Sequence, residues 1–127
     1  MARITGIGGT FFKSPDPAKL AAWYRDVLGL DVQSWGGVMF AGDDPARPHA
    51  TVWAAFPTDA SHFGPSTRDV MINFAVDDLA GMLSVLKAKG VEAHGQVEDE
   101  NGQFAWIMDP DGTKIELWQP KNETARE

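Results

Sequence analysis

The two halves of the chain repeat one order of predicted secondary structure, and this repeat limits the folds that the chain can adopt. In each half, a strand is followed by a helix and then by three further strands. Gly29 and Gly90 end the two predicted helices, and Pro57 and Pro120 end the last strands at nearly the same offset. We therefore interpret the chain as a duplicated βαβββ unit of the α+β class.

The helices are the best-defined predicted elements. The first covers residues 17–28, with Asp16 as N-cap, Pro17 at the first helical position and apolar residues at spacings of three and four. The second covers residues 78–89 and begins at a pair of aspartates. The predicted strands cover residues 4–12, 30–34, 38–41 and 49–56 in the first half, and 70–76, 91–96, 104–108 and 113–119 in the second.

We expect one domain made of two modules, because the chain is long enough for one core and short for two. Module one covers about residues 1–57, a polar connection covers 58–68, module two covers 69–120 and a polar tail covers 121–127. Two curved sheets placed edge to edge would form a cupped mixed sheet with the helices outside. The concave face is the expected ligand site.

Composition excludes several classes of protein. The sequence has no cysteine, so it forms no disulfide, and none of its apolar runs approaches the roughly 20 residues of a membrane-spanning helix. The first residues lead directly into a strand pattern, which indicates a cytoplasmic protein. The net charge of −7, from 18 acidic and 11 basic residues, disfavours nucleic acid as a partner.

The last predicted strand carries the best-placed ionisable side chain, Glu116. The preceding turn Asp109–Gly112 reverses the chain, because Pro at its second position and Gly at its fourth are typical turn residues. Alternation along the strand places Lys114, Glu116 and Trp118 on one face, opposite the aliphatic residues. A lone strand glutamate is usually solvated, so a functional role for Glu116 requires partners on its face.

Three segments of the sequence resemble the vicinal oxygen chelate superfamily, which contains glyoxalase I, extradiol dioxygenases, fosfomycin-resistance enzymes and bleomycin-resistance proteins. They are Leu20–Leu30, Phe74–Leu79, and Asp109–Gly112 with the strand that follows it. The resemblance covers nearly the whole chain. It implies paired βαβββ modules around a cupped sheet, frequent dimers, and a divalent metal in the catalytic members.

The resemblance also implies where a metal would bind, because the family takes one ligand from the first strand and one from the last strand of each module. These positions fall on Gly8 or Gly9, Trp53, Met71 and Glu116. Of these, only Glu116 is a ligand for a hard divalent ion. We therefore expect no cofactor, although a divalent metal held by Glu116 with atypical ligands stays open.

The three histidines offer little support for a metal site. His49 shares a face with Trp53 if the strand alternates regularly, which makes it a candidate partner of Glu116, but a solvated position at the rim of the sheet explains it as well. His62 and His94 show no spacing that is typical of ligand pairs, and we assign them no role.

We expect the concave face to bind a ligand through aromatic and weakly polar residues around Glu116. The candidate ligand-binding residues are Trp35, His49, Trp53, Met71, Asn73, Trp106 and Trp118, and the candidate catalytic residue is Glu116. Such a face suits a flat or cationic organic molecule. Packing between modules or in a dimer would also explain any single aromatic residue. Burial is expected to raise the pKa of Glu116, unless Lys114 or a bound cation favours the charged form.

Three functions are consistent with the sequence. The first is a metal-free protein that binds a small molecule, either to sequester it or to perform acid–base chemistry at Glu116. The alternative is a metal-dependent lyase or dioxygenase that uses Glu116 with His49 or with ligands from a second chain. The third is a structural or regulatory dimer whose own side chains fill the cup. In each case we expect a homodimer that binds neither nucleic acid nor membrane.

Overall fold

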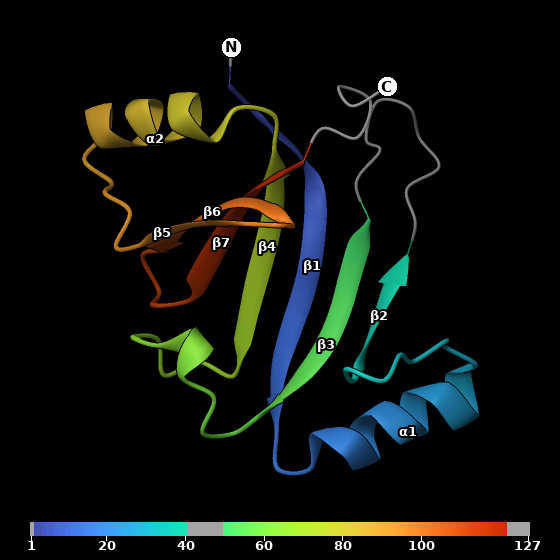
Figure 1. Cartoon of the computed structure of the whole chain (residues 1–127). Helices are drawn as coiled ribbons and strands as arrows, with labels where there is room; N and C mark the ends of the chain where they lie inside the picture. Colours follow the sequence, from blue (N-terminus) through green and yellow to red (C-terminus); the bar gives the residue numbers. More distant parts are fainter. Residues whose placement is uncertain (1, 41–49, 122–127) are drawn as a thin grey trace, which may run out of the picture.

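The computed structural model describes residues 2–40 and 50–121, and it confirms the predicted α+β class (Figure 1). No helix in these ranges is long and apolar enough to cross a membrane. The elements are β1 (Ile4–Ser14), α1 (Pro17–Leu28), β2 (Gly37–Phe40), β3 (Thr51–Pro57), the 3-10 helix η1 (Ser61–Phe63), β4 (Val70–Val76), α2 (Leu79–Ala88), β5 (Gln96–Asp99), β6 (Gly102–Met108) and β7 (Lys114–Pro120).

One open, mixed sheet contains seven strands in the order β2-β3-β1-β4-β7-β6-β5. Its two halves join where β1 pairs antiparallel with β4, side by side in the middle of Figure 1. Within the halves, β1 pairs parallel with β3 and β4 pairs parallel with β7. The halves therefore have related topologies, as the repeat predicts.

Both helices begin and end close to their predicted bounds. The side chain of Asp16 accepts a hydrogen bond of 3.1 Å from the amide of Lys19, and Gly29 ends α1 in the left-handed region at a φ of 76°. The side chain of Asp78 accepts an equivalent bond of 3.0 Å from the amide of Gly81 at the start of α2. These capping residues fix both helices locally.

Two predicted strands are wrong. Residues 30–34 form no strand, because their amides bond locally: Val32 donates to the carbonyl of Leu30, and Gln33 donates to that of Gly37 across a turn. In the predicted strand 91–96, only Gln96 belongs to β5. Such short apolar alternation is too weak a signal to distinguish a strand from an extended loop.

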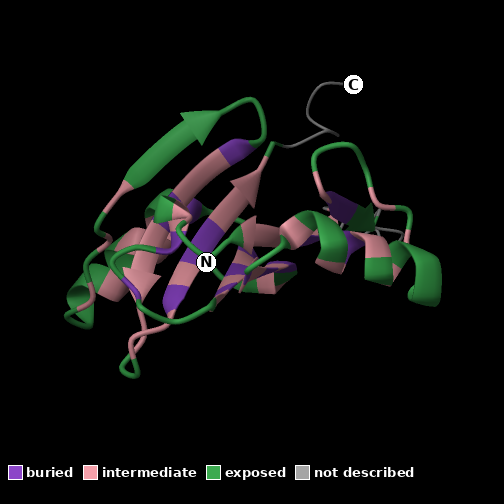
Figure 2. Ribbon diagram, turned by 90° about the horizontal axis from the view of Figure 1, so that it is seen from below, coloured by how far each residue is buried: buried purple, intermediate pink, exposed green. Residues whose placement is uncertain are grey.

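The two faces of the sheet bury different clusters of apolar residues. The helices pack on one face, α1 over a cluster that includes Ala21, Val38 and Trp53, and α2 over a cluster of Val76, Leu79, Ala105 and Leu117. The opposite face buries Phe11, Ala54, Phe63 and Met71. Figure 2 shows short buried segments, in purple, that alternate with less buried ones along strands of the sheet. Met71 on β4 is paired directly with Lys114 on β7, and Glu116, two residues further along β7, lies on the same side of the sheet. We therefore call this second face the Glu116 face.

Candidate ligand-binding face

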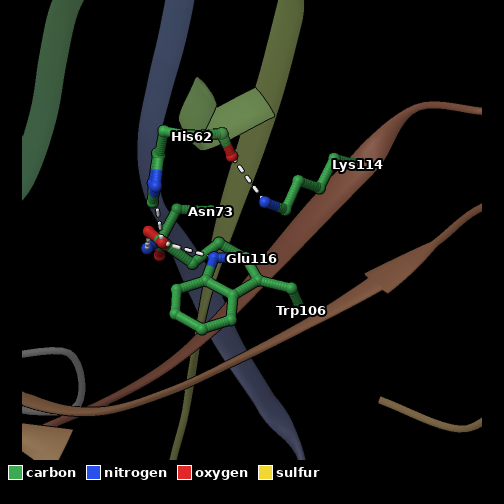
Figure 3. Close-up of polar contacts among 5 residues, drawn as sticks. All are labelled: His62, Asn73, Trp106, Lys114 and Glu116. Carbon is green, nitrogen blue, oxygen red and sulfur yellow. Dashed lines mark hydrogen bonds and ion pairs between the residues drawn. The ribbon is translucent and has the colours of Figure 1, made fainter. Parts of the chain in front are cut away.

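Glu116 is the polar centre of the Glu116 face, with only 4% of its surface exposed. Its Oε1 accepts a hydrogen bond of 2.6 Å from Nδ2 of Asn73, and its Oε2 accepts one of 2.7 Å from Nε1 of Trp106. Nε2 of His62 lies 3.2 Å from the same Oε2 (Figure 3). Both carboxylate oxygens therefore have partners within the chain, as a buried charge requires.

Strand register explains two of these three contacts. Asn73 on β4 and Trp106 on β6 are each paired directly with Glu116 on β7, so their side chains leave the sheet on the same side as the carboxylate. His62 comes from outside the sheet, on η1. Nζ of Lys114 donates a hydrogen bond of 2.5 Å to the backbone carbonyl of His62 and also lies 5.3 Å from the ring centre of Trp106.

The expectation of a raised pKa for Glu116 is wrong. Burial acts to raise the pKa of this carboxyl group, but the hydrogen bonds from His62, Asn73 and Trp106 together outweigh it and lower the pKa below its ordinary value. Burial also lowers the pKa of the Lys114 ammonium group, against the attraction of the Glu116 charge. The donors thus keep Glu116 ionised at neutral pH.

His62 is the site residue that sequence reasoning missed. The connection between the modules folds back onto the Glu116 face, where Phe63 is fully buried and His62 reaches the carboxylate. Histidine spacing gives no sign of this contact. The signal that could have revealed it is the pair His62–Phe63, because a large apolar residue inside a polar connection indicates a segment that packs on the core.

Trp53 does not lie on the Glu116 face, and its predicted position there is wrong. It packs against α1, with its ring centre 4.4 Å from that of Tyr24, on the helix side of the sheet. Its neighbour Ala54 faces the other way, in the cluster with Phe11. A shift of one position in aligning two strands exchanges their faces, which explains the error.

The other candidates divide into three groups. Asn73, Trp106 and Trp118 lie on the Glu116 face, where each is paired with a neighbour on the same side. Met71 lies there too, but it is fully buried beside Phe63. Trp35 lies over Gly37 at the far edge of the sheet and is 53% exposed. His49 falls outside the described residues.

A row of three half-buried rings extends from Glu116 along β6 and β7, and we call it the aromatic ladder: Trp106, Phe104 and Trp118. The planes of Phe104 and Trp118 differ by 6°, with ring centres 6.2 Å apart. Those of Phe104 and Trp106 differ by 10°, with centres 6.5 Å apart. Side chains on paired and alternate strand positions face the same way, so the three rings form one row on the same side of the sheet.

Beside the ladder lies a buried acceptor without a partner. Oδ1 of Asn73 has no hydrogen bond, and it is the only such buried side-chain atom within residues 2–40 and 50–121. It occupies the space next to Gly8, where a Cβ atom would lie 2.2 Å from it and 2.8 Å from Cε3 of Trp118. A side chain at position 8 would therefore have to displace Asn73 or Trp118.

The described residues do not fit the divalent metal of the resemblance. On the first strands, one ligand position is glycine and the other is Met71. On the last strand of module one, Ala54 pairs with β1 as Glu116 pairs with β4, so an alanine stands at the position that corresponds to Glu116. Both oxygens of Glu116 are already hydrogen-bonded. No group of three His, Cys, Asp or Glu side chains that could hold a metal occurs in the described part of the chain.

Comparison with known proteins settles the family. A sequence model of the Glyoxalase/Bleomycin resistance protein/Dioxygenase superfamily matches residues 7–117. The chain belongs to this superfamily. Comparison with curated proteins gave no match. The family match spans both modules and confirms the resemblance found in the sequence.

Solved structures of this fold include enzymes with different reactions. Methylmalonyl-CoA epimerase from Mycobacterium tuberculosis is 19% identical, with a TM-score of 0.65 over 98% of this chain and 93% of that one. A Streptomyces coelicolor methylmalonyl-CoA epimerase variant in complex with 2-nitronate-propionyl-CoA is 18% identical, with a TM-score of 0.70 over 94% and 100%. The 2,2',3-trihydroxybiphenyl 1,2-dioxygenase of Sphingomonas wittichii is 20% identical, with a TM-score of 0.59 over 94% and 42%. At these identities, the similarity shows the fold alone.

Proposed function

We propose that this superfamily member binds a flat organic molecule, aromatic or cationic, on the aromatic ladder without a divalent metal. The observation that carries the proposal is the ladder itself: three nearly parallel, half-buried rings next to a buried carboxylate. Aromatic rings that remain partly exposed on a sheet face offer stacking surface to a flat ligand. The predicted homodimer and cytoplasmic location stay predictions.

The charge of the protein favours a cationic ligand over an anionic one. The net charge is −7, and the face of an aromatic ring attracts a cation within about 6 Å of its centre. Glu116 contributes indirectly, because its oxygens are occupied by Asn73 and Trp106. Its role in binding is to hold Trp106 at the end of the ladder.

A thermal-shift screen in EDTA, over flat aromatic cations, aromatic metabolites and antibiotics, tests this function. A compound that raises the melting temperature is then titrated against the protein and against Phe104→Ala. We expect the dissociation constant to rise about 5-fold or more, since loss of one stacking contact costs about 1–3 kcal/mol. Binding that requires added metal would contradict the proposal.

Phe40→Ala is the matched control for that titration. Phe40 is 46% exposed on the edge strand β2, away from the ladder, so its loss removes a similar ring without touching the proposed site. We expect its dissociation constant to equal that of the unmodified protein. If Phe40→Ala and Phe104→Ala weaken binding equally, the ladder is not the binding surface.

A further inference from the structure

The pairing of His62 with Glu116 leaves one imidazole nitrogen open. Nε2 of His62 lies 3.2 Å from Oε2 of Glu116, so the carboxylate accepts the Nε2 proton and the neutral ring carries its lone pair on Nδ1. Nδ1 has no hydrogen-bond partner among the described residues. The one buried side-chain atom without a partner in that part of the chain is Oδ1 of Asn73, so Nδ1 of His62 is not buried. It is therefore accessible, in agreement with the 39% exposure of the side chain.

The imidazole ring is held in place from several sides. The ring of Phe56 stacks on it, with centres 6.0 Å apart and planes 19° apart, and Trp106 meets it at 87° with centres 6.0 Å apart. Lys114 fixes its backbone carbonyl. A ring held by packing and by a carboxylate loses little freedom when it meets a reactant, which is how sites favour reaction.

His62 also stands at the end of the aromatic ladder. Trp106 contacts the imidazole ring on one side and Phe104 on the other, and its indole nitrogen donates to the same oxygen that faces His62. A molecule stacked on the ladder would thus lie next to the imidazole. The carboxylate is too enclosed to reach such a molecule, so His62 is the group that can touch it.

We propose that His62 and Glu116 form a metal-independent proton-transfer pair, in which Nδ1 of His62 removes a proton from a carbon acid bound on the aromatic ladder. Glu116 is the positioning residue: it fixes the tautomer and balances the charge of the imidazolium ion. This inference rests on the proposed binding function and adds a reaction class to it. The substrate class is a flat molecule with an acidic C–H bond beside an electron-withdrawing group.

The step balances without a further reactant. The C–H bond of the substrate breaks, its proton forms a bond to Nδ1, and the electron pair passes into the electron-withdrawing group of the substrate. The imidazolium ion then returns its proton to the product or to water. The charged groups next to His62 are Glu116, which pairs with the imidazolium ion, and Lys114, whose ammonium group is bonded to the backbone carbonyl of His62.

The test uses 5-nitrobenzisoxazole, a flat aromatic carbon acid, with the whole protein in EDTA. Removal of its C–H proton by a base breaks the ring N–O bond, the oxygen takes the electron pair, and a coloured cyanonitrophenolate is released. We expect turnover to fall about 100-fold in His62→Gln, within the usual range for a general base. His94→Gln is the control, because His94 is exposed and bonds to the ladder only through its backbone amide, which the substitution keeps, and its turnover should be unchanged.

Glu116→Gln separates positioning from a merely structural role. We expect it to lower kcat by a larger factor than it raises KM for the same compound, because it removes the charge that pairs with the imidazolium ion, whereas a fold-wide change would alter the near-ultraviolet circular dichroism spectrum. The proposal is overturned if the protein turns the compound over no faster than His62→Gln. Quenching of tryptophan fluorescence by the compound reports binding separately. Quenching without turnover refutes only the proton-transfer pair, whereas the absence of both refutes ladder binding of this compound as well.

Discussion

At the scale of single residues, the hydrogen bonds to Glu116 decide its chemistry. Only 4% of its surface is exposed, and burial alone would favour the protonated carboxyl group. Donors from Asn73, Trp106 and His62 surround its two oxygens and reverse the direction of the pKa shift. Sequence alternation predicted the face of Glu116 correctly. It could not predict this shift, because His62 approaches from a segment that is distant in the chain.

Glu116→Gln should lower the free energy of unfolding by about 2 kcal/mol at neutral pH, because hydrogen bonds to a charged group are lost. The pKa of Glu116 in the folded protein is lower than its ordinary value of 4.5, so its stabilising contribution is present above about pH 4.5 and disappears as the pH falls through the folded pKa. Urea denaturation measures the free energy of unfolding of both proteins at neutral and at acidic pH. The difference between Glu116→Gln and the unmodified protein should be smaller in acid.

Glu92→Gln provides the control for that series, since Glu92 is exposed on the segment before β5. It should change the free energy of unfolding by less than about 0.5 kcal/mol at either pH, as surface substitutions usually do. If the free energy of unfolding of Glu116→Gln differs from that of the unmodified protein by the same amount at neutral and at acidic pH, the pKa of Glu116 is not lowered.

At the scale of elements, the connection between the modules belongs to the site. Three side-chain hydrogen bonds tie it to β7 and to the turn before β7. Lys114 Nζ donates to the carbonyl of His62 at 2.5 Å. Ser66 Oγ donates to the carbonyl of Gly112 at 2.5 Å, and Arg68 Nη2 donates to that of Asp111 at 2.9 Å. These contacts hold η1 over the sheet. The polar residues of the connection, with Gly64 and Pro65, indicate a surface loop, and only Phe63 among them signals packing on the sheet.

Lys114→Met should loosen η1 while leaving the sheet intact. Methionine keeps the apolar stem, but the hydrogen bond to His62 and the attraction to the ring of Trp106 are lost, which should cost about 1–2 kcal/mol. Hydrogen–deuterium exchange should become faster at the amides of η1 and not at those of β4. Lys87→Met, on the exposed surface of α2, is the control and should leave exchange in both η1 and β4 unchanged. If η1 exchanges at the same rate in the unmodified protein, Lys114→Met and Lys87→Met, Lys114 does not anchor η1.

The helices and the strand faces differ in how well the sequence predicts them. Asp16, Asp78 and Gly29 act on nearby parts of the chain, so the helix ends could be predicted. We predicted that Trp53 holds the same position in module one as Glu116 holds in module two. That prediction used the spacing between Pro57 and Pro120, the prolines that end the last strands. The spacing between the two aspartate caps is slightly shorter, and it matches Glu116 with Ala54 instead. Register between distant strands is set by pairing, which no local signal reports.

At the scale of the whole molecule, pairing of β1 with β4 joins two related halves into one sheet and brings the family ligand positions to one face. The fold is that of a superfamily with several chemistries, so function depends on the residues that occupy this face. Here glycine, Ala54 and Met71 occupy three of those positions, and Glu116 is bonded within the chain. We therefore expect a binding face that works through its own side chains.

Metal content decides whether this face works without a divalent ion. Protein purified without chelator is analysed by inductively coupled plasma mass spectrometry, and its melting temperature is compared with and without EDTA. Within the described residues no set of ligands could hold a divalent ion, so we expect no stoichiometric nickel, zinc, iron or manganese and no change in melting temperature. One tightly bound divalent ion per chain, with a melting temperature that falls in EDTA, would contradict a metal-free binding face.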